Sequence, residues 1–344
     1  MKTIYQVARE AMDGQITQYL ELLEATNGFE QIKKEHLEDP EIAILFSAGL
    51  GHRLDLDQKD YSSFLIREYH RKAAVPFDVE NAVSIGVYKK IRPYAELLYE
   101  KAKKLTKGFT LFEAEGLQTN PCLLPVFQNM LGFSKAQLKK KIGLVSDSSI
   151  SCPASERFAT ILSDSIHIES IVKSNILQRI EITLEGIVRD LVGRVLFEEV
   201  VAHSLDKYEV EYLREEEYSS ITGVVYDFRS DFVIPNSINP VAFIEVRKSS
   251  SRHASLYAKD KMFSAINWKG KYKNLIGVIV VEGDWTQSTL QIMSKVFDYV
   301  IPLNKTPLLA KLLRKALDGD KSILRWLIDF KINPSKGFSD KNLV

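Results

Sequence analysis

The sequence is poor in the residues that build disulfide frameworks or thiolate metal sites. Its 344 residues include two cysteines, Cys122 and Cys152, which are too few and too isolated for either. It lacks a run of about eighteen apolar residues, the length of a membrane-spanning helix. Its first residues also lack the apolar stretch typical of a signal peptide. We therefore expect a protein of the reducing cytoplasm with no membrane partner.

Two further absences narrow the function. The sequence has no Gly-Lys-Ser or Gly-Lys-Thr loop that could cradle phosphates, which argues against an NTPase motor. Five of its six histidines show no metal-ligand spacing. The composition, 45% hydrophobic and 26% charged, is that of a soluble globular protein with a substantial core. Because the formal net charge is only +1, a nucleic-acid partner would require local positive charge.

The residue pattern predicts two domains. The N-terminal part is mostly helical in pattern, and residues 145–155 form a polar, proline-containing stretch that is typical of a linker. We therefore predict a helical domain over residues 1–150, a candidate for DNA recognition, and a second domain over residues 151–344. Helices are expected in the first domain over residues 6–23, from an Asp78 cap towards Leu105, and over 135–142 between a Ser134 cap and Gly143.

A long helical pattern opens the second domain and contains one carboxylate among apolar residues. Glu198 occupies the missing position of this stripe, whereas Glu199 lies about 100° away around the helix. Because a lone desolvated carboxylate is costly, Glu198 is expected to have a cation, a donor or a metal as partner. The apolar stripe itself consists of Leu184, Val188, Leu191, Val195, Ala202 and Leu205.

The pattern then changes to strands with intervening helices. A period of two indicates a half-exposed strand over residues 208–212, and a continuous apolar run indicates a buried strand over 275–281. The order predicts an α/β fold with a mixed sheet, antiparallel first and then connected by crossovers. The other expected elements are strands over 223–234, 241–248 and 299–303, and helices over 252–266, 288–296, from Thr306-Pro307 onward, and 321–330.

Two acids fall on the predicted hairpin around residues 235–240. If Ile234 pairs with Val241, Asp231 lies opposite Ile244, within one residue of register. The carboxylates of Asp231 and Glu245 would then reach one ion, and without a cation their repulsion would raise one pKa. Hard oxygen ligands on a partly open site suit Mg²⁺ or Mn²⁺.

The acids are followed by a basic segment. This local charge could contact DNA, although most such segments are solvated lysine-rich faces. A single acid, Asp260, interrupts it. Its basic residues are Arg247, Lys248, Arg252, Lys259, Lys261, Lys269, Lys271 and Lys273.

This part of the sequence contains two segments, Ser230-Asp231-Phe232-Val233-Ile234 and Glu245-Val246-Arg247, with thirteen residues between Asp231 and Glu245. These segments resemble the motif of the PD-(D/E)xK nuclease superfamily. The resemblance implies a restriction-endonuclease-like core: a mixed central sheet flanked by helices. It also implies that Asp231 and Glu245 bind Mg²⁺, for which Mn²⁺ can substitute, with Glu198 as an accessory metal ligand. The implied activity is that of a type II restriction endonuclease, which hydrolyses phosphodiester bonds at a specific site in double-stranded DNA as a homodimer.

The motif departs from the family pattern at two positions. Ser230 replaces a frequent proline, and Arg247, assigned here a catalytic role, replaces the expected lysine. Arginine cannot serve as a base, but it can hold phosphate. Lys248, Lys259 or Lys261 could supply the missing amine.

Several readings remain open. Arg252 and His253, after Ser249–Ser251, are candidates for phosphate binding, with an ordinary helix cap as the alternative. Asp227 is a weaker candidate ligand, and a salt bridge of Glu245 with Arg247 is the structural alternative for the acids.

Lys139–Lys141 could touch DNA, although a solvated face is favoured. Trp268 and Trp285 are expected in the core. The alternative functions are a structure-specific repair or anti-phage nuclease, and a catalytically inactive DNA-binding protein of the same fold.

Overall fold

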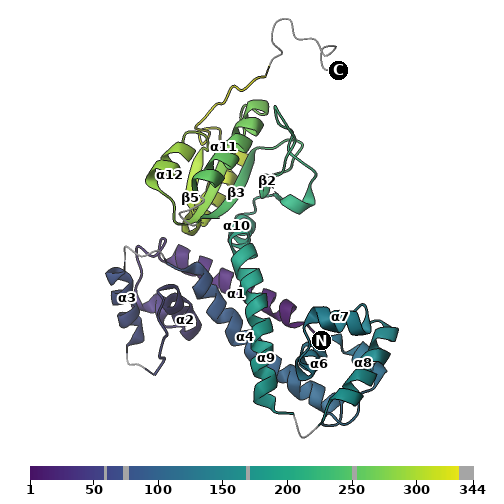
Figure 1. Ribbon diagram of the computed structural model, residues 1–344. Helices are drawn as coiled ribbons and strands as arrows, with labels where there is room; N and C mark the ends of the chain where they lie inside the picture. The colour runs from purple at the N-terminus through teal and green to yellow at the C-terminus, as the bar shows by residue number, and fades with distance from the viewer. Residues whose placement is uncertain (58–59, 73–76, 168–170, 250–253, 333–344) are drawn as a thin grey trace, which may run out of the picture. The chain divides into compact units, whose positions relative to one another are not determined.

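The computed structural model describes residues 1–57, 60–72, 77–167, 171–249 and 254–332. The chain forms two compact units (Figure 1). The helical unit comprises Met1–Tyr19 and Lys33–Leu196, and the sheet unit comprises Leu20–Ile32 and Phe197–Val344. No helix of the described residues is long and apolar enough to cross a membrane.

The helical unit contains the predicted helices. Asp78 caps its longest helix by accepting a hydrogen bond from the Asn81 backbone N–H, as expected. Ser134 likewise caps a helix that ends at Gly143. The helices of this part of the chain are α1 (Ile4–Ala25), α2 (Pro40–Gly49), α3 (Tyr61–Arg71), α4 (Val79–Leu105), α5 (Ala114–Thr119), α6 (Leu124–Leu131), α7 (Lys135–Ile142), α8 (Cys152–Ser165) and α9 (Lys173–Asp190).

The helical unit extends to Leu196, whereas the residue pattern predicted a domain boundary at residue 150. The difference arises because α8 packs on α5 and α7, and α9 packs on α4 and α6, so both helices belong to the helical unit. The expected linker over residues 145–155 is a short turn with a bridge between Val145 and Ile150, followed by α8.

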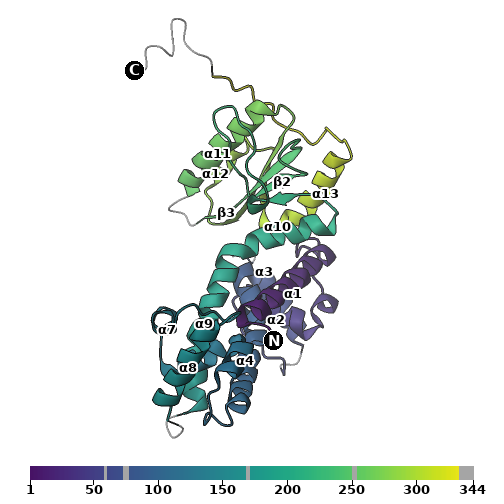
Figure 2. The same cartoon turned by 90° about the vertical axis from the view of Figure 1, so that its right-hand side faces the viewer.

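The sheet unit is α/β, with a mixed five-stranded sheet in the order β1-β2-β3-β4-β5. β2 pairs antiparallel with both of its neighbours, β1 and β3, whereas the β3–β4 and β4–β5 pairs are parallel. Figure 2 shows α11 and α12 on one face of the sheet and α13 on the other. The elements are α10 (Leu196–Lys207), β1 (Leu213–Arg214), β2 (Phe232–Ile234), β3 (Ala242–Ser249), α11 (Ala254–Lys271), β4 (Ile276–Gly283), α12 (Gln287–Met293), β5 (Tyr299–Pro302) and α13 (Thr306–Leu317).

An apolar core between the sheet and α11 fixes the strands. Phe243 of β3 meets Trp268 of α11 edge-on, with ring centroids 4.9 Å apart, and both side chains are fully buried. The expected core role of Trp268 is therefore confirmed, and Trp285 packs partly buried against the same core. Because β3 and α11 are held together this way, residues on either element keep a defined spacing.

Three expected elements of the sheet unit are wrong. Residues 208–210 do not start a strand, because their backbone N–H groups bond to carbonyls at the end of α10 and Glu209 has a φ of 53°. The strand expected over 223–234 is shortened to β2, because the side chain of Asn267 bonds the backbone of Val225 and Tyr226. Residues 321–330 are not helical, because the carboxylate of Asp298 accepts backbone N–H groups there.

The long helix expected over 184–205 is interrupted. A π-helical turn over Leu191–Val195 separates α9 from α10 and inserts an extra residue into the helical repeat. The apolar stripe therefore rotates, and the positions buried in α10 include Phe197, Val200 and Val201. Glu199 becomes buried and Glu198 is half-buried.

Candidate functional site

The β2–β3 hairpin brings Asp231 and Glu245 together. Phe232 pairs with Ile244, so the residues one step further along the same register are Asp231 and Glu245. The register differs by one residue from the expected Ile234–Val241 pairing, because Ile234 pairs with Ala242. This difference agrees with the prediction, which placed Asp231 opposite Ile244 within one residue of register. Both acids are buried, with exposed fractions of 7% for Asp231 and 0% for Glu245.

A hydrogen-bonded loop sets the position of Asp231. The Tyr218 hydroxyl accepts from the Ser230 backbone N–H at 2.7 Å and donates to the Ser230 carbonyl at 2.8 Å. The Ser230 hydroxyl in turn donates to the Phe232 carbonyl at 2.7 Å. Ser230, which stands where the PD-(D/E)xK motif often has proline, is thus tied to the backbone on both sides of Asp231. The sequence contained no signal for this role of Tyr218.

Arg247 joins the two acids. Its Nη1 donates to Asp231 Oδ2 and its Nη2 donates to Glu245 Oε2, both at 2.8 Å. Asp231 Oδ2 also accepts the Val246 backbone N–H at 2.6 Å. The guanidinium therefore holds one oxygen of each carboxylate and leaves the other oxygen to further partners. The ion pair between Glu245 and Arg247, weighed as the structural alternative, is present together with the juxtaposed acids.

Lys261 supplies an amine to the site from α11. Its Nζ lies 3.0 Å from Glu245 Oε2, and its side chain is only 11% exposed. Of the three lysines considered from the sequence, this is the one that reaches the acids. Lys259 is exposed on α11, and the ammonium of Lys248 lies over the Phe197 ring, 5.5 Å from its centroid.

The remaining oxygen of Glu245 has no hydrogen-bond partner among the residues that the structure describes. Oε1 is buried and unsatisfied among the described residues. Burial and the neighbouring Asp231 carboxylate raise the pKa of Glu245 to about 7, although Arg247 and Lys261 oppose the shift. Such an oxygen is costly to bury unless a donor or a cation reaches it.

Glu198 faces the same group of charges from α10. Burial and the Asp231 carboxylate raise the pKa of Glu198 to about 7, against the opposing effect of Arg247. The resemblance to the PD-(D/E)xK motif implied a metal role for Glu198, and its carboxylate lies in the electrostatic field of Asp231. Glu198 therefore adds a third acid to the surroundings of Asp231 and Glu245, and carboxylate oxygens are the ligands that hard divalent cations prefer.

Glu199, the next residue, has a separate structural role that the sequence did not reveal. It accepts two hydrogen bonds from Arg214 of β1, at 2.5 Å and 3.0 Å. This pair fastens α10 to the edge of the sheet and so helps to hold Glu198 near the hairpin. The π-helical turn made the pair hard to foresee, because it changes which of the two adjacent glutamates is buried.

Other predicted residues do not join the site. Asp227 is exposed and accepts a hydrogen bond from the Gly223 backbone N–H at 3.2 Å. Its neighbour Arg229 pairs with Glu215. Arg252 and His253 lie outside the described residues, so the structure says nothing of their proposed contact with phosphate.

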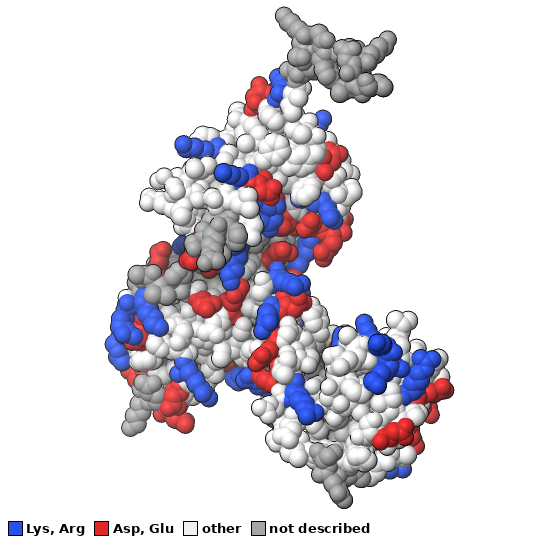
Figure 3. Space-filling view, viewed as in Figure 1, with Lys and Arg blue, Asp and Glu red and all other residues white. Residues whose placement is uncertain are grey.

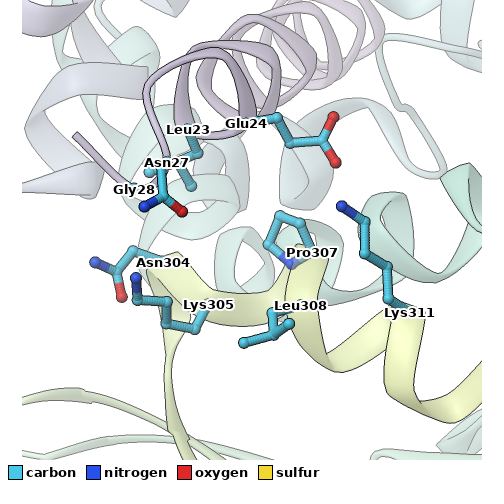
Figure 4. Close-up of a pocket in the computed structure, with 9 residues that line it drawn as sticks. All are labelled: Leu23, Glu24, Asn27, Gly28, Asn304, Lys305, Pro307, Leu308 and Lys311. Atoms are coloured by element: carbon cyan, nitrogen blue, oxygen red, sulfur yellow. The ribbon is translucent and has the colours of Figure 1, made fainter. Parts of the chain in front are cut away.

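A hollow of about 170 Å³ elsewhere in the sheet unit contains none of these site residues (Figure 4). Leu23 and Glu24 face it from the end of α1, and Lys305, Pro307 and Lys311 face it from the start of α13. The hollow is therefore distinct from the carboxylate site.

Comparisons with known proteins assign no function to this arrangement. No protein-family model matches the chain, and comparisons with curated proteins and with solved structures gave no match. A function must therefore be argued from the chemistry of the carboxylate site itself.

Proposed function

We propose that the sheet unit carries the active site of a metal-dependent DNA endonuclease of the PD-(D/E)xK type. The observation that carries this proposal is the pair of buried carboxylates, Asp231 and Glu245, adjacent on one hairpin with Glu245 Oε1 unsatisfied. A purely structural ion pair with Arg247 would explain Asp231 Oδ2 and Glu245 Oε2 but not Glu245 Oε1.

The donor set fits a divalent cation. Asp231 and Glu245 would hold Mg²⁺, or Mn²⁺ in its place, with Glu198 as the accessory ligand, since all three offer hard carboxylate oxygens. When bound, such an ion activates water and neutralises charge on the scissile phosphate.

The protein's own residues complete the site in distinct ways. Arg247 orients both acids by holding Asp231 Oδ2 and Glu245 Oε2. Lys261 brings an ammonium to Glu245 Oε2, and this amine occupies the role of the family lysine that Arg247 cannot fill. A positive group at this position can stabilise the charge that develops on a phosphate during cleavage.

The order of elements supports the same proposal. The acids lie on an antiparallel hairpin, and β3 leads through α11 to the parallel strand β4. This is the arrangement that a restriction-endonuclease-like core requires. The specific activity we propose is that of a type II restriction endonuclease: a cytoplasmic homodimer that cuts both strands of double-stranded DNA, because a twofold dimer supplies two active sites.

The test is cleavage of phage DNA with Mg²⁺ by the wild type and by Asp231→Asn, Glu245→Gln and Asp227→Asn. We expect discrete bands from the wild type and from the Asp227 control, whose side chain is exposed outside the site. The other two variants should be inactive. Cleavage by Asp231→Asn at the wild-type rate would overturn the assignment, and a smear from the wild type would favour a structure-specific repair or anti-phage nuclease.

A second candidate is a DNA-binding protein of this fold without catalytic activity. The observation in its favour is that Arg247 already pairs with both acids through short contacts. This candidate predicts DNA binding with no cleavage in Mg²⁺ or Mn²⁺, in the wild type as well as in the variants.

A further inference from the structure

The helical unit carries two short helices joined by a tight turn. α6 ends at Leu131, and Gly132 adopts a left-handed conformation with a φ of 68°, which favours glycine. Ser134 then caps α7 through a reciprocal pair of hydrogen bonds with Gln137. The turn is therefore fixed at both ends, and three residues separate the end of α6 from the start of α7.

The apolar side of α7 is fully used inside the helical unit. Leu138 and Ile142 have exposed fractions of 0%, and α7 packs against α8. α6 is anchored by Phe127, whose ring meets Phe158 of α8 edge-on with centroids 6.2 Å apart. The two helices thus form a rigid support whose remaining side faces solvent.

That remaining side is basic. Lys140 points opposite to the buried pair, and Lys139 and Lys141 flank it about 100° to either side. Lys135, in the first turn, is exposed as well. Figure 3 shows Lys and Arg side chains gathered over the part of the helical unit that contains α7.

These charges lack carboxylate partners. Among the described residues, no lysine of α7 forms an ion pair, and the helix contains no acid. Elsewhere in the helical unit, Arg92 pairs with Glu181 at 2.5 Å and Lys173 pairs with Glu100 at 2.8 Å. The ammonium of Lys141 lies over the Phe133 ring, 5.2 Å from its centroid, but among the described residues no acid offsets the positive charge of α7.

Two arginines extend the basic surface, and neither forms an ion pair with an acid of the described residues. Arg157 of α8 donates to the Ile142 carbonyl at 3.2 Å, at the end of α7. Arg179 of α9 donates to the Asn129 carbonyl at 3.1 Å, near the end of α6. Both are exposed. One cation thus lies at the end of α7, and the other lies near the turn between α6 and α7.

We propose that α7 binds double-stranded DNA, lying in the major groove with its lysines on the flanking phosphates. The major groove admits an α-helix, and helix–turn–helix proteins place their second helix there. A groove is bordered by two phosphate strands, which matches lysines on both flanks of α7. A membrane surface is disfavoured, because the apolar side of α7 is buried and cannot insert. The proposal rests on the nuclease assignment for its choice of DNA as the polyanion.

The test measures binding separately from cleavage. Fluorescence anisotropy with a labelled random-sequence duplex, in EDTA, compares the full-length wild type with Lys140→Gln/Lys141→Gln. The matched control is Lys103→Gln/Lys104→Gln, which removes two exposed lysines from the last turn of α4. We expect the α7 variant to bind roughly tenfold more weakly, with a salt dependence shallower by about 0.9 per lost phosphate contact. The α4 control should bind like the wild type.

The conservative variant Lys140→Arg/Lys141→Arg should restore binding and its salt dependence, because charge alone holds the phosphates. A labelled single strand of the same sequence should bind more weakly, with little dependence on these lysines. Equal affinities for the α7 variant and the α4 control would overturn the proposal, as would the absence of salt-sensitive duplex binding by the wild type.

The two proposals can fail separately. Asp231→Asn should bind the duplex as the wild type does, because α7 makes no use of the acids. If the α7 variant loses binding although Asp231→Asn still cuts DNA, the surface is supported and the active site is refuted. If the α7 variant binds normally while Asp231→Asn is inactive, the surface is refuted and the active site is retained.

Discussion

Lys261 of α11 and Glu245 of β3 form an ion pair with a separation of 3.0 Å between Nζ and Oε2. Residues far apart in the sequence are brought together because the helix that carries Lys261 packs on the strand that carries Glu245. The pair places an ammonium where the motif itself has only Arg247. It thus explains how this site could contain an amine although the motif lysine is missing.

The first prediction concerns that amine. Lys261→Gln should slow DNA cleavage by roughly 10²–10⁴-fold if the ammonium takes part in proton transfer or charge stabilisation. Lys259→Gln should cut at nearly the wild-type rate, since that side chain is exposed on the same helix. Single-turnover cleavage at saturating protein measures both. Slow cleavage by Lys259→Gln together with wild-type cleavage by Lys261→Gln would show that Lys259, and not Lys261, has this role.

A second prediction concerns Arg247. Arg247→Gln removes the cation that holds Asp231 and Glu245, and should lower the free energy of unfolding in EDTA by about 3 kcal/mol. Arg229→Gln, which breaks an exposed pair with Glu215, should cost less than about 1 kcal/mol. Urea unfolding measures both. Equal stability of the two variants would show that Arg247 does not brace the acids.

The raised carboxyl pKa values predict an unusual pH dependence. Glu245 binds its proton more tightly in the folded than in the unfolded protein, with a pKa of about 7 against an ordinary 4.5. The same holds for Glu198. The free energy of unfolding without metal should therefore fall as pH rises through this window. Carboxyl groups with a lowered pKa, such as that of Glu41, affect the free energy of unfolding only at pH values below this window.

Urea unfolding in EDTA across this pH range measures the effect. Glu245→Gln should show a shallower decline than the wild type, because one of the two titrating groups is removed. A decline as steep as in the wild type would mean that Glu245 does not titrate as the geometry indicates. Added Mg²⁺ should also flatten the wild-type profile, since metal binding requires the ionised carboxylates.

The fourth prediction concerns the C-terminal segment. Asp298 pairs with the fully buried Lys269 and also accepts the backbone N–H groups of Arg325 and Trp326. Asp298→Asn should lower the free energy of unfolding by about 3–5 kcal/mol, because a buried ammonium loses its counter-charge. Asp320→Asn, at an exposed position, serves as the control. Comparable unfolding free energies for the two variants would refute this role.

Local sequence pattern was sufficient to predict the β2–β3 hairpin and its acids. Strand periodicity and the proline-bounded turn both act over a few residues, so Asp231 and Glu245 could be placed opposite each other within one register step. The choice among Lys248, Lys259 and Lys261 could not be made this way. It depends on where α11 begins and on its rotation about its axis, both of which are set by packing of residues such as Trp268.

Tertiary contacts overrode local preference at the failed predictions. The extra residue of the π-helical turn reversed the burial expected for Glu198 and Glu199, and nothing in residues 191–195 announced it. The alternation of Tyr208, Val210 and Tyr212 favoured a strand. Instead, carbonyls at the end of α10 accept hydrogen bonds from the backbone N–H groups of residues 208–210. The segment after residue 321 lost its helix to the carboxylate of Asp298.

The proposed metal site is tested by titrating the protein with Mn²⁺ and following the loss of the free-ion electron paramagnetic resonance signal. We expect the wild type and Asp227→Asn to bind the ion with the same affinity, and Glu245→Gln and Asp231→Asn to bind it far more weakly. Equal binding by all four proteins would refute the site, because the ion would then lie away from Asp231 and Glu245.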